Sequence, residues 1–174
     1  MYANVRTLDQ GHELRYERRL NHPVEEVWAA LTEPPRIRDW LGRAERFELE
    51  VGGAYEIHWE NSDAVMEATI TKLEPPRLLE TDSESHGRLR WELAADGAGC
   101  RLTLIVTMDA PEHLTKAAAG WHLHLDLMES RLDGATPVNW DEDDWMSDWE
   151  RIHERYVELY GAEADAATES GSRR

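Results

Sequence analysis

Cysteine and lysine are scarce in this chain of 174 residues, which has one cysteine, Cys100, and two lysines, Lys72 and Lys116. A single thiol cannot form an internal disulfide, and this fits a reducing compartment. Basic residues number 19 against 36 acidic ones, which gives a formal net charge of −17. A field of this sign repels phosphate backbones and anionic lipids, so we expect neither a nucleic-acid partner nor a stable membrane association.

Long apolar runs are also missing. No stretch approaches the roughly 20 apolar residues of a membrane span, and residues 1–12 are polar where a signal peptide has an apolar core. We therefore expect a cytoplasmic protein. The length suits one domain with appendages. The expected parts of the chain are an N-terminal segment at 1–12, a domain at 13–134, a linker with an amphipathic helix at 135–160, and a disordered tail at 161–174.

Strand and helix spacings alternate in the first 110 residues. Residues 13–20 alternate as a strand, Pro23 then opens a helix that Pro34-Pro35 ends, and a short helix follows at 36–41. From Arg46 to Met108 the period is two, with turn residues at hairpin spacing, which predicts an antiparallel meander. The expected features of this meander are a first strand through Phe47, Leu49 and Val51, turns at Gly52-Gly53 and Asn61-Ser62-Asp63, and a strand at 78–83 whose inward side the pattern leaves open.

Two further helices follow the meander. The first begins at Pro111 and ends at Gly134, and its apolar stripe must pack against the sheet. Residues 144–160 show the same spacing of three and four. We expect this second helix to dock on its own domain, with a homodimer through the same face as the alternative. The stripes comprise Leu114, Ala118, Trp121, Leu125, Met128 and Leu132 in the first helix, and Trp145, Trp149, Ile152, Tyr156 and Leu159 in the second.

Several short motifs occur in order along the chain. They are residues 22–32 (HPVEEVWAALT), Trp40-Leu41, residues 51–53 (VGG), residues 73–78 (LEPPRL), residues 120–126 (GWHLHLD) and residues 132–134 (LDG). This series resembles bacterial members of the activator of heat-shock protein 90 ATPase homologue family, within the START-like, Bet v 1-like or SRPBCC superfamily. The resemblance implies an α+β helix-grip fold, in which a curved antiparallel sheet wraps around a long C-terminal-side helix and encloses a cavity, here with an additional C-terminal helix. It also implies a bacterial protein with a link to stress response.

Tryptophan is the informative excess, with eight residues. Trp28, Trp40, Trp59, Trp91 and Trp121 fall on inward faces, where large aromatic side chains either fill a core or hold a flat apolar ligand. Given the implied cavity, we expect Trp59, Trp91 and Trp121 to line it together, with Tyr55, His124 or Arg90 orienting the ligand. The predicted ligand-binding residues are Trp40, Tyr55, Ile57, Trp59, Met66, Leu89, Trp91, Leu104, Trp121, His124, Leu125 and Met128.

Catalytic and metal motifs are not apparent. No Gly-x-Ser-x-Gly elbow occurs, and Cys100 at a strand start is typical of a core thiol. His122 and His124 lie two apart on a helix, so they project about 200° from each other and cannot chelate one ion. We predict no catalytic residue, no metal and no cofactor. Glu56, Glu60, Glu67 and Glu92 would face solvent, and Glu80 and Asp82 remain open acid–base candidates because their register is unresolved.

Three functions are compatible with these observations. The first is binding of an apolar or amphipathic small molecule, whether lipid-like, aromatic or polyketide-like, between sheet and long helix and without catalysis. The second, implied by the family, is a chaperone-associated protein that uses an external surface. The third, implied by the superfamily, is an enzyme like the polyketide cyclases or aromatases, in which the cavity orients a reactive chain.

Overall fold

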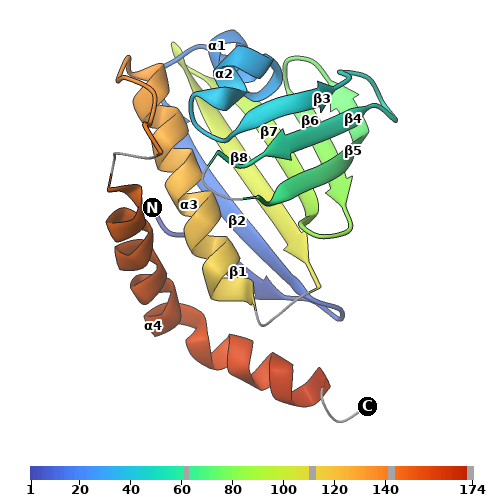
Figure 1. The fold of residues 1–174 in the computed structure, drawn as a ribbon, viewed down its shortest axis with the longest axis vertical. Helices are drawn as coiled ribbons and strands as arrows, with labels where there is room; N and C mark the ends of the chain where they lie inside the picture. Colours follow the sequence, from blue (N-terminus) through green and yellow to red (C-terminus); the bar gives the residue numbers. More distant parts are fainter. Residues whose placement is uncertain (61–62, 110–112, 141–143, 172–174) are drawn as a thin grey trace.

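A computed structural model describes residues 1–60, 63–109, 113–140 and 144–171, with side chains described up to Gly161 (Figure 1). It contains an eight-stranded sheet and four helices within these residues. The strands are β1 (Asn4–Thr7), β2 (His12–Leu20), β3 (Arg43–Phe47), β4 (Ala54–His58), β5 (Val65–Glu74), β6 (Leu78–Ser83), β7 (Gly87–Asp96) and β8 (Gly99–Met108). The helices are α1 (Val24–Thr32), α2 (Pro34–Arg38), α3 (Leu114–Leu132) and α4 (Trp145–Gly171).

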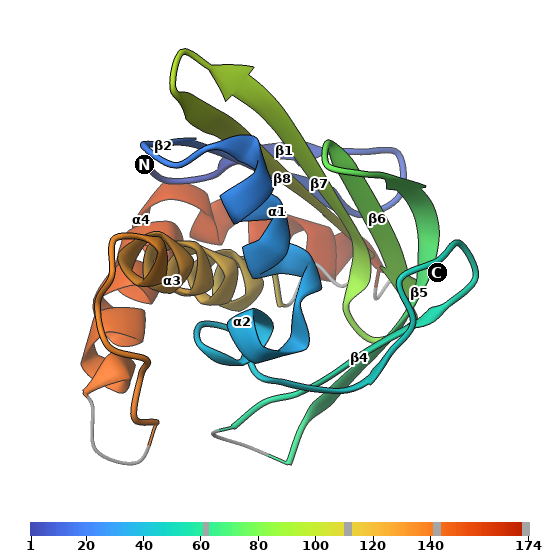
Figure 2. The ribbon, with the colours of Figure 1, turned by 90° about the horizontal axis from the view of Figure 1, so that it is seen from above.

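The sheet is antiparallel throughout, in the order β1-β2-β8-β7-β6-β5-β4-β3, and it curves around α3 (Figure 2). Alternation along each strand places one row of side chains on the inner face. Tyr16, Leu104, Trp91 and Leu79 stand opposite one another on β2, β8, β7 and β6, and all four are buried. The expected α+β helix-grip fold is thereby confirmed.

Helix α3 lies along the inner face of the sheet. Its predicted stripe is buried from Leu114 to Met128, and only Leu132 in the last turn is partly exposed. The helix ends at Leu132 with Asp133 as its C-cap, and Gly134 follows with a φ of +88°, a left-handed conformation that favours glycine after a helix. The expected start at Pro111 lies outside the described residues.

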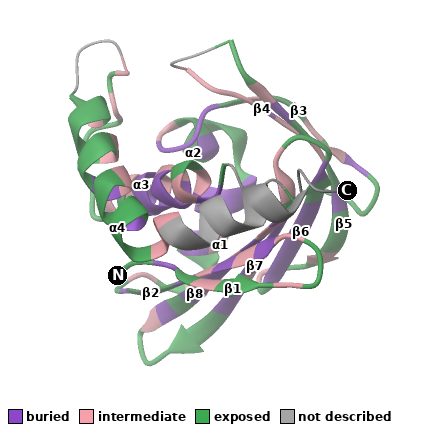
Figure 3. Ribbon diagram, turned by 90° about the horizontal axis from the view of Figure 1, so that it is seen from below, coloured by how far each residue is buried: buried purple, intermediate pink, exposed green. Residues whose placement is uncertain are grey.

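Helix α4 packs against α3 and against the N-terminal residues that precede β1. Ile152 is 3% exposed and Tyr156 is fully buried, so the amphipathic helix docks on its own domain. The predicted stripe is wrong at its end, because Leu159 is 42% exposed and the next residue, Tyr160, packs inward and donates a hydrogen bond to the carbonyl of Ala3. In Figure 3, most of the described residues of α4 are coloured as exposed.

The C-terminal tail from Gly161 also differs from expectation, since α4 continues to Gly171. Residues 161–171 are rich in alanine and glutamate, which have high helix propensity. The prediction of a disordered tail rested on low apolar content and did not take this helix propensity into account. None of the described helices is long and apolar enough to cross a membrane.

Three other boundaries differ from the sequence pattern. Strand β1 lies within the N-terminal segment at 1–12, for which no element was predicted. Strand β3 ends at Phe47, so that Leu49 and Val51 lie in an exposed loop. This loop closes on itself through the hydrogen bond from the Gly53 amide to the Glu50 carbonyl. Helix α2 begins at Pro34 because proline fits a first helical turn, where its missing N–H would have no intrahelical partner.

The register of β6 answers the question that the pattern left open. Leu79, Thr81 and Ser83 alternate on the inner face, opposite Trp91, Leu89 and Gly87 of β7. Glu80 and Asp82 consequently lie on the outer face. The turn expected at Asn61-Ser62-Asp63 falls largely outside the described residues.

Candidate functional site

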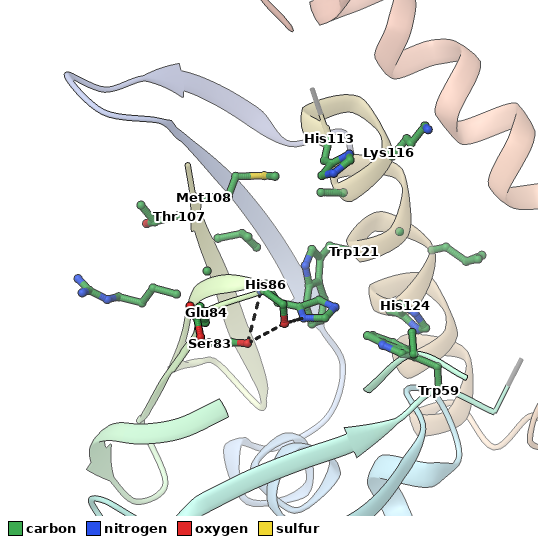
Figure 4. Close-up of a pocket in the computed structure, with 18 of the residues that line it drawn as sticks. Trp59, Ser83, Glu84, His86, Thr107, Met108, His113, Lys116, Trp121 and His124 are labelled. Atoms are coloured by element: carbon green, nitrogen blue, oxygen red, sulfur yellow. Dashed lines mark hydrogen bonds between the residues drawn. The ribbon is translucent and has the colours of Figure 1, made fainter. Parts of the chain in front are cut away.

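A cavity of about 1030 Å³ opens at one end of the fold (Figure 4). Its walls come from the first half of α3, the β6–β7 hairpin, the end of β8, the segment between β4 and β5, the start of α4, and Trp140 in the segment before α4. Five of the eight tryptophans line it. They are Trp59, Trp121, Trp140, Trp145 and Trp149.

His124 lies among three of these rings. The ring centroid of His124 is 5.0 Å from that of Trp59, 6.1 Å from that of Trp140 and 6.2 Å from that of Trp121. The interplanar angle to Trp59 is 32°, so the two rings are tilted relative to each other. This aromatic group forms one wall of the cavity.

The protonation of His124 follows from its surroundings. Its Nδ1 lies 2.9 Å from the carbonyl oxygen of Trp40, which can only accept, so Nδ1 carries the hydrogen and donates. Burial lowers the pKa of His124 to about 4, although the hydrogen bond to Trp40 works in the opposite direction. The ring is therefore neutral at pH 7, with Nε2 as an acceptor.

The β6–β7 hairpin carries a short polar chain that also borders the cavity. Ser83 Oγ lies 3.3 Å from Ser85 Oγ, which lies 2.8 Å from Nδ1 of His86, as the dashed lines in Figure 4 show. The His86 ring is tilted against Trp59 at 6.2 Å, and burial lowers the pKa of His86. These groups can hydrogen-bond or exchange protons with a molecule in the cavity.

Three of the predicted ligand-binding residues line the cavity, namely Trp59, Trp121 and His124. Trp91 does not line it, because Trp91 lies beneath Trp121 at 5.9 Å and against Trp40 at 6.1 Å, which closes the space between sheet and helix. The remaining predicted residues pack in the hydrophobic core. These residues are Trp40, Tyr55, Ile57, Met66, Leu89, Trp91, Leu104, Leu125 and Met128.

Several lining residues were missed by the sequence reasoning. Ser83 and His86 sit in a hairpin whose register was unknown, and Gly120 was noted only as part of a motif. The apolar stripe of α4 correctly predicted that Trp145 and Trp149 face the rest of the protein. It could not predict that they line a cavity there.

Of the two open acid–base candidates, Asp82 borders the cavity and Glu80 does not. Glu80 contacts Arg90 at 3.0 Å and Thr71 at 3.0 Å on the outer face. Burial alone would raise the pKa of Glu80, but these hydrogen bonds outweigh it and the pKa is lowered. Asp82 is exposed and lies 3.7 Å from Arg88. Arg90 was expected to orient a ligand, but it does not line the cavity. Its guanidinium group is held by Glu80 and Glu92 instead.

Metal-ligating groups come together at one described place, on β3 and β4. Ligand atoms of Glu45, Glu56 and His58 lie within 4.8 Å of one another. These atoms already have partners, since His58 Nε2 is 2.6 Å from Glu56 and Glu45 is 2.7 Å from Arg43. The surface ion pairs account for this cluster, and we assign no metal to it.

Comparison with known proteins identifies one matching family and several solved structures with a similar fold. The family described as Activator of Hsp90 ATPase homolog 1-like protein matches residues 21–133. No curated protein matches the chain. The solution structure of CalU16 from Micromonospora echinospora is 23% identical and has a TM-score of 0.74, with 92% of this chain and 94% of CalU16 covered.

Two further solved structures match a smaller part of this chain. MLL2253 from Mesorhizobium loti is 23% identical with a TM-score of 0.63, and the match covers 70% of this chain and 96% of that protein. DynU16, from the dynemicin biosynthetic locus, is 20% identical with a TM-score of 0.61, and the match covers 72% of this chain and 48% of DynU16. At these identities the comparison establishes the fold alone.

Proposed function

The chain belongs to the Activator of Hsp90 ATPase homolog 1-like family, and from this premise we propose that its tryptophan-lined cavity binds an apolar or amphipathic small molecule without transforming it. The observation that carries the proposal is the lining itself, in which five tryptophans border one space of about 1030 Å³. Ligand sites typically measure about 300 to 1,000 Å³ and combine an apolar wall with a few placed polar groups.

The position of these tryptophans favours a ligand over simple packing. Trp40 and Trp91 are almost completely buried and fill the core, whereas Trp59, Trp140, Trp145 and Trp149 are only partly buried. Partly exposed large rings that face one cavity lose further apolar surface to water when a ligand enters, at about 25 cal/mol for each Å². The binding free energy would come mainly from this burial.

A binding experiment tests the proposal. Protein purified without detergent is titrated with prodan, an uncharged naphthalene dye, and binding is followed by energy transfer from tryptophan. We expect saturable binding that Trp59→Ala weakens. Trp28→Ala is the matched control, because Trp28 is also partly buried but lies on α1 outside the cavity. A non-saturable signal, or equal weakening by both variants, would contradict a site in the cavity.

The polar chain in the hairpin supports a second candidate, an enzyme of the polyketide cyclase kind. His86, with Ser83 and Ser85 behind its Nδ1, has the chemistry to accept or donate a proton at a bound substrate. Turnover of an aromatic polyketide-like substrate that His86→Gln abolishes would favour this alternative. The chaperone alternative is supported by the description of the family alone.

A further inference from the structure

Helix α3 has a glycine, Gly120, in its interior. Glycine is among the least favourable residues there, since it loses the most backbone freedom when the helix forms. Such a residue usually has a packing reason. A packing reason of this kind is seen outside the helices at Gly87, where a Cβ would collide with the carbonyl oxygen of Thr107 on β8.

Gly120 has no such reason within the described protein. A Cβ built at Gly120 would meet no neighbouring heavy atom within 4 Å. The position opens instead into the cavity, between Ala117, Trp121 and His124 on the same helix. The missing side chain therefore adds free space directly over the α3 backbone.

The other cavity walls offer rings rather than aliphatic chains. Trp59 is tilted by 37° to His86 and by 32° to His124, so these rings present faces as well as edges. Aliphatic side chains larger than alanine are a minority of the lining, with Val106, Met108 and Leu123. Offset stacking and edge-to-face contacts favour a planar aromatic molecule over a flexible acyl chain in such surroundings.

We propose that Gly120 is a ligand-contact position, at which a planar aromatic molecule lies directly against the backbone of α3 in the space that a side chain would occupy. This inference rests on the proposed binding function and deepens it, because it names the class of ligand and a residue that sets the shape of the site.

The test compares two helix-interior glycines in the full-length chain. Gly120→Ala adds a methyl group inside the cavity, while Gly161→Ala adds one on α4, where it makes an ordinary contact of 3.5 Å with Val157. Both substitutions should raise the midpoint of unfolding, because alanine favours a helix. Only Gly120→Ala should weaken prodan binding, by about fivefold or more, since an inserted methyl group in a filled site is costly. Gly120→Leu should abolish binding while the protein still melts cooperatively.

The outcomes separate the two proposals. If Gly120→Ala and Gly120→Leu bind prodan as tightly as the wild type, the contact at Gly120 is wrong and the binding function stands. If 1-dodecanol, a flexible uncharged chain, binds more tightly than prodan, the aromatic class is wrong. If the wild-type protein binds neither probe, the proposed function fails and the inference fails with it.

Discussion

At the scale of single residues, two histidines respond to pH with opposite signs. His124 is held neutral by burial beside the cavity, with its pKa lowered to about 4. His22 bridges Asp133 at 2.7 Å and Glu26 at 3.3 Å, and the hydrogen bond to Asp133 raises the pKa of His22. The charged form is therefore disfavoured at the first site and favoured at the second.

We predict that His124 makes the folded state less stable in mild acid. His124 binds a proton near pH 6.5 in the unfolded chain but only near pH 4 in the folded chain. The free energy of unfolding therefore falls as pH drops through this window. One pKa unit corresponds to about 1.4 kcal/mol, which gives a loss of about 3 kcal/mol at most. The loss is smaller where the edge of the ring that borders the cavity is solvated.

Urea melts between pH 7 and pH 4.5 measure this effect. The wild type should lose more stability with acid than His124→Gln, because carboxylates titrate in both proteins and cancel in the comparison. His22→Gln gives the contrast. The contribution of His22 is fully present below pH 6.5 and is lost as pH rises through its raised pKa. Identical pH slopes for the wild type and His124→Gln would show that His124 is not buried as a neutral ring.

At the scale of elements, α4 is held to α3 by polar contacts as well as by apolar packing. Tyr156 Oη accepts a hydrogen bond from the Ala3 amide at 2.8 Å and lies 3.1 Å from Nδ1 of His122. On its other side, His122 faces Asp126, which the buried side chain of Arg18 contacts at 3.1 Å. The helix thus joins the N-terminal residues, β2 and α3 in one network.

We predict that ending the chain at Gly134 destabilises the domain. Removal of α4 exposes the surfaces beneath Ile152 and Tyr156, and each buried side chain of this size is worth about 1.5 to 3 kcal/mol. The shortened protein should therefore lose about 3 kcal/mol or more in denaturant melts, or aggregate. Tyr156→Phe in the full-length chain isolates the polar part, with an expected loss of about 1 to 3 kcal/mol. A shortened protein that is monomeric and equally stable would contradict the role of α4 in packing.

The elements differ in how far the sequence could predict them. The stripe of α3 and the inner row of the sheet depend on local period, so Trp91, Leu104 and Trp121 were placed on the correct faces. The position of the cavity depends instead on which part of the space between sheet and α3 is filled by side chains. Trp40 and Trp91 fill the centre of this space. The cavity that remains is bounded by the β6–β7 hairpin and by α4, and a local sequence pattern cannot predict how these two elements are placed relative to each other.

At the scale of the whole molecule, the cavity is shared among parts that are distant in sequence. Trp59 follows β4, His86 sits between β6 and β7, and Trp149 belongs to α4. A ligand held by all three would stabilise the folded state according to its concentration relative to its dissociation constant. Binding and folding are therefore linked across the entire chain.

The final prediction concerns the net charge of −17. Exposed ion pairs such as Arg155–Glu158 contribute about 0 to 1 kcal/mol each, so screening them costs little. Repulsion among the excess carboxylates opposes the compact state and is screened beyond a Debye length of about 10 Å at 0.1 M salt. Added NaCl should thus raise the melting temperature at pH 7, and choline chloride at equal ionic strength should do the same. A melting temperature that falls with NaCl would mean that attractive pairs outweigh the repulsion, and a rise with NaCl alone would indicate sodium binding in place of screening.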